Sequence, residues 1–225
     1  VTDTSRFWIK AQELINLDKK LRFFKTHNIL GGLNGNQFTN TKNTIGSIYI
    51  VRDPRNVITS LKNHFEMNDS DALEFMLSKN KYTYNYHAEN DYSDFQFISS
   101  WENNYKSWKN QKNIPVKFIK YEDLNSKTYE VFKELINFIN TTSKNKNIFD
   151  RNKAQKAIYS SSFDNLKTIE SKNGFSESVL SKKRTKKISF FHLGPKNNWK
   201  KIFSEDYQNK LTLKFESNLK ELNYI

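Results

Sequence analysis

The chain has 225 residues, with 37 Lys and Arg against 24 Asp and Glu, so its formal net charge at neutral pH is +13. It contains no cysteine, which excludes disulfides, thiolate metal sites and a cysteine nucleophile. The positive charge indicates attraction to an anionic partner, which on charge alone is a nucleic acid, an anionic membrane or a phosphorylated small molecule.

The composition also sets the expected class of the protein. Aromatic residues make up 15% of the chain and supply large side chains for a core, so we expect one globular domain over residues 1–225. No apolar run reaches the roughly 20 residues of a membrane-spanning helix. The absence of cysteine is typical of a reducing, cytoplasmic location. Nothing in the sequence indicates an oligomeric state.

Short apolar runs that end abruptly at polar residues predict the strands. They are residues 21–24 (LRFF), 48–51 (IYIV) and 116–119 (VKFI). Continuous apolar runs are typical of strands that are covered on both faces, as in parallel sheets. Arg22 and Lys117 interrupt two of the runs, so we expect those two strands nearer an edge of the sheet.

Between and after these strands, apolar residues recur at helical spacing. Pro54 suits the first turn of a helix, which residues 57–65 continue. Residues 97–108 carry an aromatic stripe that predicts a core-facing helix, and residues 131–139 predict another amphipathic helix. The polar residues 141–147 predict a loop. Strands that alternate with helices indicate an α/β fold with a central, mainly parallel sheet flanked by helices.

The polar residues that follow the predicted strands are the first candidates for a binding site. In open α/β sheets, ligands bind outside the carboxyl ends of the strands. We therefore expect four residues along one edge of the sheet: Lys25, His27, Arg52 and Tyr121. The Arg52 guanidinium is placed to grip a phosphate that also faces the positive N-terminus of the following helix. The alternative is that Arg52 pairs with Asp53 or another carboxylate, and the sequence leaves both open.

Ser60 and His27 are further candidates. Ser60, two turns along the helix, adds a hydroxyl donor if its side of the helix faces the ligand. His27 follows Lys25 by two positions, so both side chains point the same way if the strand continues that far. A neutral imidazole can take a proton from an acceptor hydroxyl, while Lys25 stabilises charge on a leaving group. We expect His64 and His87 to be ordinary histidines, and no residue cluster requires a metal.

These residues resemble a known family, the cytosolic-type sulfotransferases that use 3′-phosphoadenosine 5′-phosphosulfate (PAPS). In that family a Lys-Thr-His segment supplies a catalytic base and a lysine near the transferred sulfuryl group, which matches residues 25–27. Residues 49–60 (YIVRDPRNVITS) look like the family's 3′-phosphate motif. The resemblance implies that Arg52 and Ser60 hold the 3′-phosphate, the group that distinguishes PAPS from ordinary adenine nucleotides.

Two further segments resemble the adenine-binding parts of the family, in the family's order along the chain. Residues 121–124 (YEDL) are similar to the segment whose tyrosine contacts the adenine, which is Tyr121 here. Residues 161–163 (SSF) resemble the later segment that wraps the adenine. The resemblance therefore implies that Ser161 and Phe163 bind the nucleotide, with Phe163 placed to stack on the base.

The last matching segment, residues 191–200 (FHLGPKNNWK), departs from the family pattern of Arg-Lys-Gly followed by Gly-Asp-Trp-Lys. Gly194 is retained and is a candidate nucleotide-binding residue. His192 and Leu193 replace the Arg-Lys pair, which forms a second clamp on the 3′-phosphate. Lys196 or the basic run 182–187 are the candidates to compensate for the lost cations.

The resemblance implies a P-loop NTPase-like sulfotransferase fold, with one segment missing at the front. The family's 5′-phosphosulfate loop, of the form YPKSGTT, normally precedes the segments quoted above, and none of the 6 glycines of the chain lies in such a loop. We therefore expect an N-terminally incomplete chain. Residues 31–35 (GGLNG) are interpreted as a flexible loop on the acceptor side of the site.

The sequence thus predicts sulfuryl transfer from PAPS to a hydroxyl or amine of a small-molecule acceptor, in line, with His27 as base. Two other classes stay open, a non-catalytic adenine-nucleotide-binding module and a basic nucleic-acid-binding protein. No nucleic-acid motif is found, and the aromatic residues fall on core-like stripes, so no nucleic-acid partner is expected. A kinase-like reaction is a further alternative, against which Arg52 and Ser60 argue.

Overall fold

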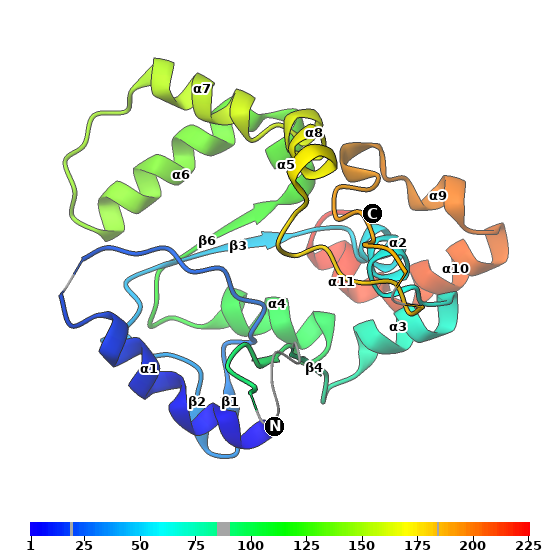
Figure 1. Cartoon of the computed structure of the whole chain (residues 1–225), viewed down its shortest axis with the longest axis horizontal. Helices are drawn as coiled ribbons and strands as arrows, with labels where there is room; N and C mark the ends of the chain where they lie inside the picture. The colour runs from blue at the N-terminus through cyan, green and yellow to red at the C-terminus, as the bar shows by residue number, and fades with distance from the viewer. Residues whose placement is uncertain (19, 85–90, 184) are drawn as a thin grey trace. The chain divides into compact units, whose positions relative to one another are not determined.

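The computed structural model describes residues 1–18, 20–84, 91–183 and 185–225 of the chain (Figure 1). These residues form two compact units. The first comprises Val1–Ile50, Leu77–Ile119 and Leu135–Asn147, and the second comprises Val51–Met76, Lys120–Glu134 and Ile148–Ile225. His87, and Arg184 of the basic run, lie outside the described residues.

Strands β3 (Ser47–Val51) and β6 (Val116–Lys120) form the parallel pair of the α/β fold (Figure 1). The rings of Tyr49 and Phe118, one from each strand, stack with centroids 5.1 Å apart. The prediction of strands at both places is confirmed. The first four residues of each strand belong to the first unit, and the last residue of each, Val51 or Lys120, belongs to the second.

The two faces of β3 differ in burial. Val51 is buried, whereas Ile50 on the opposite face is 51% exposed. Residues along a strand alternate between its faces. The expectation that this strand is covered on both faces is therefore wrong for the described part of the chain.

The helices begin where local capping chemistry places them. Helix α2 (Pro54–Phe65) has proline in its first turn, and the Asp53 side chain accepts a hydrogen bond from Arg55 N as its cap. Helix α4 (Trp101–Asn110) is capped by Ser100, so the aromatic stripe enters the helix only at Trp101. Its core-facing role is confirmed, because Tyr105 and Trp108 are buried.

Residues 21–24 do not form the predicted strand. The structure assigns them no regular element, and Phe23 and Phe24 are 69% and 66% exposed. The guanidinium of Arg22 instead forms a bidentate pair with the carboxylate of Asp18. No neighbouring strand pairs with this run in the described chain, so its apolar pattern alone misled the prediction.

Residues 31–35, interpreted from the sequence as a flexible loop, lie in a short β-hairpin. Strand β1 (Gly32–Leu33) pairs antiparallel with β2 (Asn36–Gln37). Asn34 and Gly35 between them have φ of 51° and 78°, as a two-residue type I′ turn requires. The Ser5 hydroxyl donates to the Leu33 carbonyl at 3.1 Å and fixes the hairpin to the start of the chain.

The other elements are short strands and helices. The first unit contains η1 (Thr2–Phe7), α1 (Trp8–Ile15), β4 (Tyr82–Thr83) and its antiparallel partner β5 (Gln96–Phe97). Helix α6 (Thr128–Thr142) spans the junction at Leu135, as the periodicity predicts a helix there. The second unit contains α3 (Asp69–Leu77) as far as Met76, α5 (Tyr121–Ser126), α7 (Arg151–Ser160), α8 (Phe163–Asn173), η2 (Gly194–Lys196), α9 (Trp199–Ile202), α10 (Glu205–Lys214) and α11 (Glu216–Glu221).

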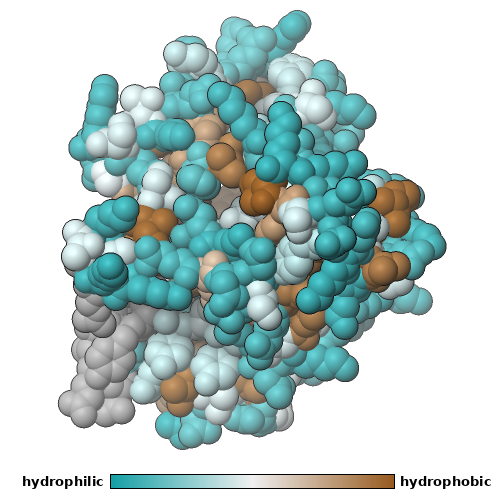
Figure 2. Space-filling view, turned by 90° about the vertical axis from the view of Figure 1, so that its right-hand side faces the viewer, coloured by the Kyte–Doolittle hydropathy of each residue, from teal (hydrophilic) through white to brown (hydrophobic). Residues whose placement is uncertain are grey.

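The face drawn in Figure 2 is mostly hydrophilic, with apolar residues in small separate groups, as the low mean hydropathy of the chain predicts. Among the described residues, no helix combines the length and the apolar character that crossing a membrane requires.

Candidate functional site

Arg52, the first residue after β3, is the centre of a polar and aromatic cluster in the second unit. Its Nη2 donates to the carbonyl oxygen of Gly194 at 2.9 Å. Its guanidinium carbon lies 4.2 Å from the centre of the Tyr121 ring, a cation–π distance. Arg52 Nε is buried and has no hydrogen-bond partner among the described residues. A buried donor without an acceptor is costly, so this atom points to a ligand that supplies one.

Asp53 does not neutralise Arg52, because its carboxylate binds Arg55 instead. Arg55 Nη2 lies 2.8 Å from Asp53 Oδ2, and both side chains are buried. The Arg55 guanidinium also lies 4.2 Å above the Trp199 ring. The alternative that the sequence left open, in which Arg52 pairs with Asp53, is therefore wrong.

Ser60 belongs to a second part of the same cluster, built around the buried side chain of Asn197. Asn197 Nδ2 donates to the Asn56 carbonyl at 3.0 Å and to Ser60 Oγ at 3.3 Å. Asn197 Oδ1 accepts from the Thr59 hydroxyl at 2.8 Å. The Ser60 hydroxyl itself lies on an exposed residue and donates within its helix to the Asn56 carbonyl. This network holds the α2 helix against the segment that carries Gly194.

Gly194 and Phe163 are in direct contact, and only glycine fits there. A Cβ on Gly194 would lie 2.2 Å from Phe163 Cε2, and Gly194 has φ of +52°, in the left-handed region. Phe163 also packs edge-on against Phe191, with ring centroids 6.1 Å apart. The structure therefore brings Phe163 and the segment that carries Gly194 together. Arg52 joins the cluster through the Gly194 carbonyl.

The segment 191–194 is contacted by a cation from α8. Lys167 Nζ donates to the His192 carbonyl at 3.2 Å and lies 5.7 Å from the centre of the Phe163 ring. Ser161 ends α7, where its hydroxyl donates to the Ala157 carbonyl at 2.8 Å. Ser161 is thus near Phe163 in the chain, but its hydroxyl makes a local helix-end bond.

A carboxylate organises the segment that leads to Gly194. Glu170 on α8 accepts from the Ser178 and Ser189 hydroxyls and from the backbone N–H groups of Phe190 and Phe191, at 2.7–3.0 Å. Burial by itself raises the pKa of Glu170, but these hydrogen bonds outweigh it and lower the pKa to about 2.

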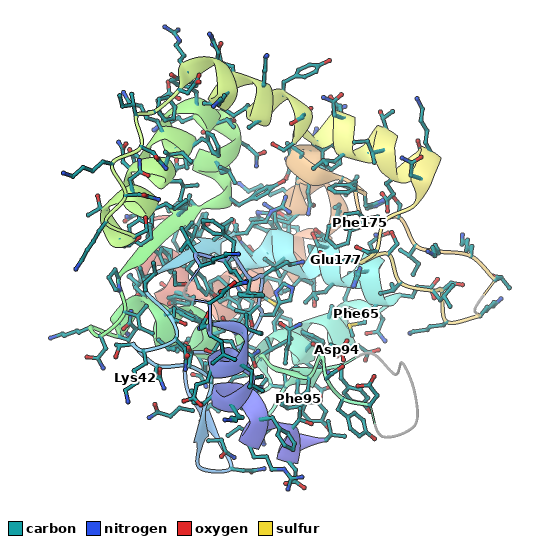
Figure 3. The ribbon with its side chains drawn as sticks, turned by 60° about the vertical axis from the view of Figure 1, so that its left-hand side comes forward. Lys42, Phe65, Asp94, Phe95, Phe175 and Glu177 are labelled. Atoms are coloured by element: carbon teal, nitrogen blue, oxygen red, sulfur yellow. The ribbon has the colours of Figure 1, made fainter. Side chains whose placement is uncertain are left out.

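An aromatic cluster accompanies the Glu170 hydrogen bonds. Phe175, labelled in Figure 3, packs on Phe190 and Phe191 with ring centroids 4.8 and 5.1 Å away. This segment is therefore fixed by both a carboxylate and stacked rings.

A second carboxylate joins the ends of the two parallel strands. Glu122, next to Tyr121, accepts from Asp53 N at 3.2 Å and from the Tyr224 hydroxyl at 2.8 Å. Burial and the neighbouring Glu122 carboxylate raise the pKa of Tyr224 well above its ordinary value. Residues 52–53 and 121–122 are therefore tied to each other and to the end of the described chain.

Lys25 and His27 lie in the first unit, on the irregular segment before the β1–β2 hairpin. Both are exposed. Gln96 Oε1 accepts from His27 N, and Asn104 Nδ2 donates to the His27 carbonyl at 3.0 Å. The strand predicted at residues 21–24 is not formed, so the condition under which Lys25 and His27 would point the same way along a strand is not met.

The sequence interpretation missed six side chains that hold the candidate residues. Gln96 and Asn104 lie in the first unit. Asn56, whose Oδ1 accepts from Trp199 N at 3.0 Å, lies in the second unit with Lys167, Glu170 and Asn197. Most are amides whose role depends on hydrogen bonds across long sequence separations, which no local pattern reports. The one available signal was Asn197, which stands where the family pattern has a glycine. Among the described residues, His, Asp and Glu form no group of three that could hold a metal ion.

Comparisons with known proteins identify the family of the chain. Residues 7–223 match the family described as Sulfotransferase domain. No curated protein matches the chain. Among solved structures, the crystal structure of mouse sulfotransferase SULT7A1 complexed with PAP is similar in fold. The match has a TM-score of 0.62 and 20% identity, over 93% of this chain and 71% of that chain. The family match spans nearly all of the described residues, and the chain belongs to the sulfotransferase domain family.

Proposed function

We propose that this protein transfers a sulfuryl group from PAPS to a hydroxyl or amine of a small-molecule acceptor. The observation that carries the proposal is the Arg52 cluster, in which a buried guanidinium nitrogen lacks a partner among the described residues. An arginine placed after a strand and before a helix N-terminus suits a phosphate, which accepts charge-assisted hydrogen bonds. The complex of the similar mouse sulfotransferase with PAP supports a 3′-phosphorylated ligand.

The donor nucleotide is assigned to the second unit. Arg52 and Ser60 hold the 3′-phosphate, and Asn197 orients the Ser60 hydroxyl. Tyr121, Ser161 and Phe163 bind the adenine. Gly194 has no side chain and leaves the Phe163 ring in place for stacking.

The chemical step is an in-line displacement at sulfur. The acceptor oxygen or nitrogen attacks as His27 removes its proton. The bond between sulfur and the bridging phosphate oxygen breaks, and its electron pair stays on that oxygen. Lys25 stabilises the charge that develops there as 3′-phosphoadenosine 5′-phosphate (PAP) leaves. Positioning and electrostatic stabilisation supply most of the acceleration, as in phosphoryl transfer.

The test is calorimetric titration of the chain with PAP and, separately, with 5′-AMP. We expect preference for PAP, and a loss of about 10- to 100-fold in PAP affinity in Arg52→Ala, because one charge-assisted contact contributes roughly 1.5–3 kcal/mol. Arg151→Ala is the matched control, since Arg151 is exposed and also lies over a tyrosine ring, at 6.0 Å. Equal affinity for PAP and 5′-AMP in the folded protein would overturn the 3′-phosphate assignment.

The nucleic-acid alternative makes a different prediction for the same sample. It requires salt-dependent binding to single-stranded DNA or RNA that PAP does not displace. If PAP displaces a bound polyanion from the wild type, and this displacement is lost in Arg52→Ala, the result supports the nucleotide site.

A further inference from the structure

The proposed base His27 lies in a stretch without secondary structure, yet its peptide groups are hydrogen-bonded on both sides. Residues 20–29 belong to no helix or strand. The Gln96 side chain, on β5, accepts from His27 N–H through Oε1. The Asn104 side chain, on α4, donates from Nδ2 to the His27 carbonyl at 3.0 Å. Two side-chain amides therefore supply the acceptor and the donor that a neighbouring strand supplies to a residue in a sheet.

Asn104 is committed to this arrangement by three hydrogen bonds. It is 8% exposed. Besides the bond to His27, Nδ2 donates to the Ile98 carbonyl at 2.8 Å, and Oδ1 accepts from the Tyr49 hydroxyl at 2.9 Å. Both amide hydrogens and the amide oxygen are thus used, so the Asn104 side chain is held in one orientation.

The residues beside His27 are fixed in the same way. Asn28 Oδ1 accepts from Phe97 N at 2.8 Å, and the Asn28 carbonyl accepts from the buried Trp108 Nε1 at 3.0 Å. Ile29 N donates to the Phe97 carbonyl at 2.9 Å. Gln96 Oε1 also lies within hydrogen-bond distance of the Thr26 hydroxyl, at 3.5 Å. Residues 26–29 are thereby held against β5 and α4, all within the first unit.

We propose that Gln96 and Asn104 are positioning residues that set the backbone of His27, and through it the direction of the imidazole. This inference rests on the proposed role of His27 as base. A side chain leaves its backbone at an angle set by φ and ψ, so a rotated peptide carries the ring away from the proton it must take. A displacement of about 1 Å in a reacting group can lower a rate about 100-fold.

The two amides use opposite ends, which gives a sharp test. Gln96 acts through its oxygen, and Asn104 reaches His27 through its NH₂ group. Replacing an amide by a carboxylate keeps oxygen acceptors and removes donors. Gln96→Glu therefore keeps the bond to His27, whereas Asn104→Asp loses it and sets a charge beside the His27 and Ile98 carbonyls. The same chemical change has opposite consequences at the two positions.

Two further variants complete the design. Gln96→Leu removes the acceptor that Gln96→Glu keeps. Tyr49→Phe removes the hydrogen bond that Asn104 Oδ1 accepts, but it leaves the bond from Asn104 Nδ2 to the His27 carbonyl in place. If activity falls only because the buried network is less stable, it falls in both Tyr49→Phe and Asn104→Asp. If it falls because His27 is displaced, it falls in Asn104→Asp and not in Tyr49→Phe.

The first readout is independent of activity. In ¹H–¹³C NMR spectra recorded at one fixed pH of about 8.5, roughly two units above the reference histidine pKa, the His27 signal is identified by its absence in His27→Ala. We expect it to move in Asn104→Asp and Gln96→Leu, and to stay in Gln96→Glu and Tyr49→Phe. An unmoved His27 signal in Gln96→Leu and Asn104→Asp would overturn the proposal, and the Gln96 pair decides it if Asn104→Asp does not fold.

The second readout is sulfuryl transfer from PAPS, with PAP affinity measured in parallel. We expect kcat to fall about 10- to 100-fold in Asn104→Asp and Gln96→Leu while the PAP dissociation constant stays within about twofold. Equal falls in kcat for Gln96→Glu and Gln96→Leu would contradict the positioning role. The variants can show the expected NMR pattern while the wild-type chain binds no PAP and transfers no sulfuryl group. In that case the proposed function fails, while the hydrogen-bonding role of Gln96 and Asn104 stands.

Discussion

Arg52 Nη2 donates a hydrogen bond to the carbonyl oxygen of Gly194, across 142 positions of the chain, at 2.9 Å. The bond connects the end of β3 with the motif near the C-terminus. Gly194 in turn lies against the Phe163 ring, and Arg52 lies against the Tyr121 ring. Residues from four distant parts of the sequence thus meet in one cluster, and several consequences of this arrangement can be measured.

Gly194→Ala is expected to destabilise the protein and to weaken PAP binding. A left-handed φ costs an L-residue about 1–2 kcal/mol, and a Cβ that overlaps the Phe163 ring adds about 1–3 kcal/mol. Gly174→Ala is the matched control, because Gly174 has φ of +73° but nothing within 4 Å of its Cβ position. Urea unfolding should show the larger loss for Gly194→Ala. Equal losses would mean that the ring contact is unimportant.

Asn197→Ala is expected to lower both stability and affinity for PAP. The substitution removes the bond between the Thr59 hydroxyl and Asn197 and one donor to the Asn56 carbonyl, while the Thr59 hydroxyl still reaches that carbonyl at 2.7 Å. A lost hydrogen bond of this kind costs about 0.5–1.5 kcal/mol. The substitution also removes the hydrogen bond that Ser60 Oγ accepts from Asn197 Nδ2. In a double-mutant cycle with Ser60→Ala, measured by calorimetry with PAP, the effects on affinity should be non-additive. Additive effects would separate Asn197 from the phosphate site.

Asp53→Ala is expected to lower the free energy of unfolding by about 3–5 kcal/mol, because it leaves the buried Arg55 without its carboxylate. It also removes the cap of α2. Asp53→Ala combined with Arg55→Met should recover part of the loss, since no uncompensated charge remains. The exposed Glu216–Lys220 pair is the comparison, and Glu216→Gln should change the unfolding free energy much less. A small effect of Asp53→Ala would argue against a buried ion pair.

The stability of the protein is expected to fall in acid partly through Glu170. Its folded-state pKa of about 2 lies below the ordinary value of 4.5, so its contribution is fully present above about pH 4.5 and is lost as the pH falls toward 2. In Glu170→Gln, the unfolding free energy should depend less on pH across that window, while it is lower than that of the wild type at neutral pH. Identical slopes for wild type and variant between pH 4.5 and 2 would show that Glu170 is not held as an acceptor.

The sequence by itself predicted what local pattern and motif order determine. The β3 and β6 strands, the start of α2 at Pro54 and the aromatic core face of α4 follow from apolar periodicity and capping, which act over a few neighbouring residues. The order of the motifs indicated the family, and the family match over residues 7–223 agrees. The roles given to Arg52, Ser60 and His27 come from that order and await the experiments above.

Only the tertiary structure decided which partners these residues have. Whether Arg52 binds Asp53 or Gly194 depends on where residue 194 lies in space, which no pattern near residue 52 reports. The apolar residues 21–24 resemble a strand, but a strand requires a neighbour for its backbone groups, and none is paired there in the described chain. The amides Gln96 and Asn104 look like surface residues in the sequence. They become structural through hydrogen bonds to a segment some 70 residues earlier, because folding brings that segment's backbone groups within their reach.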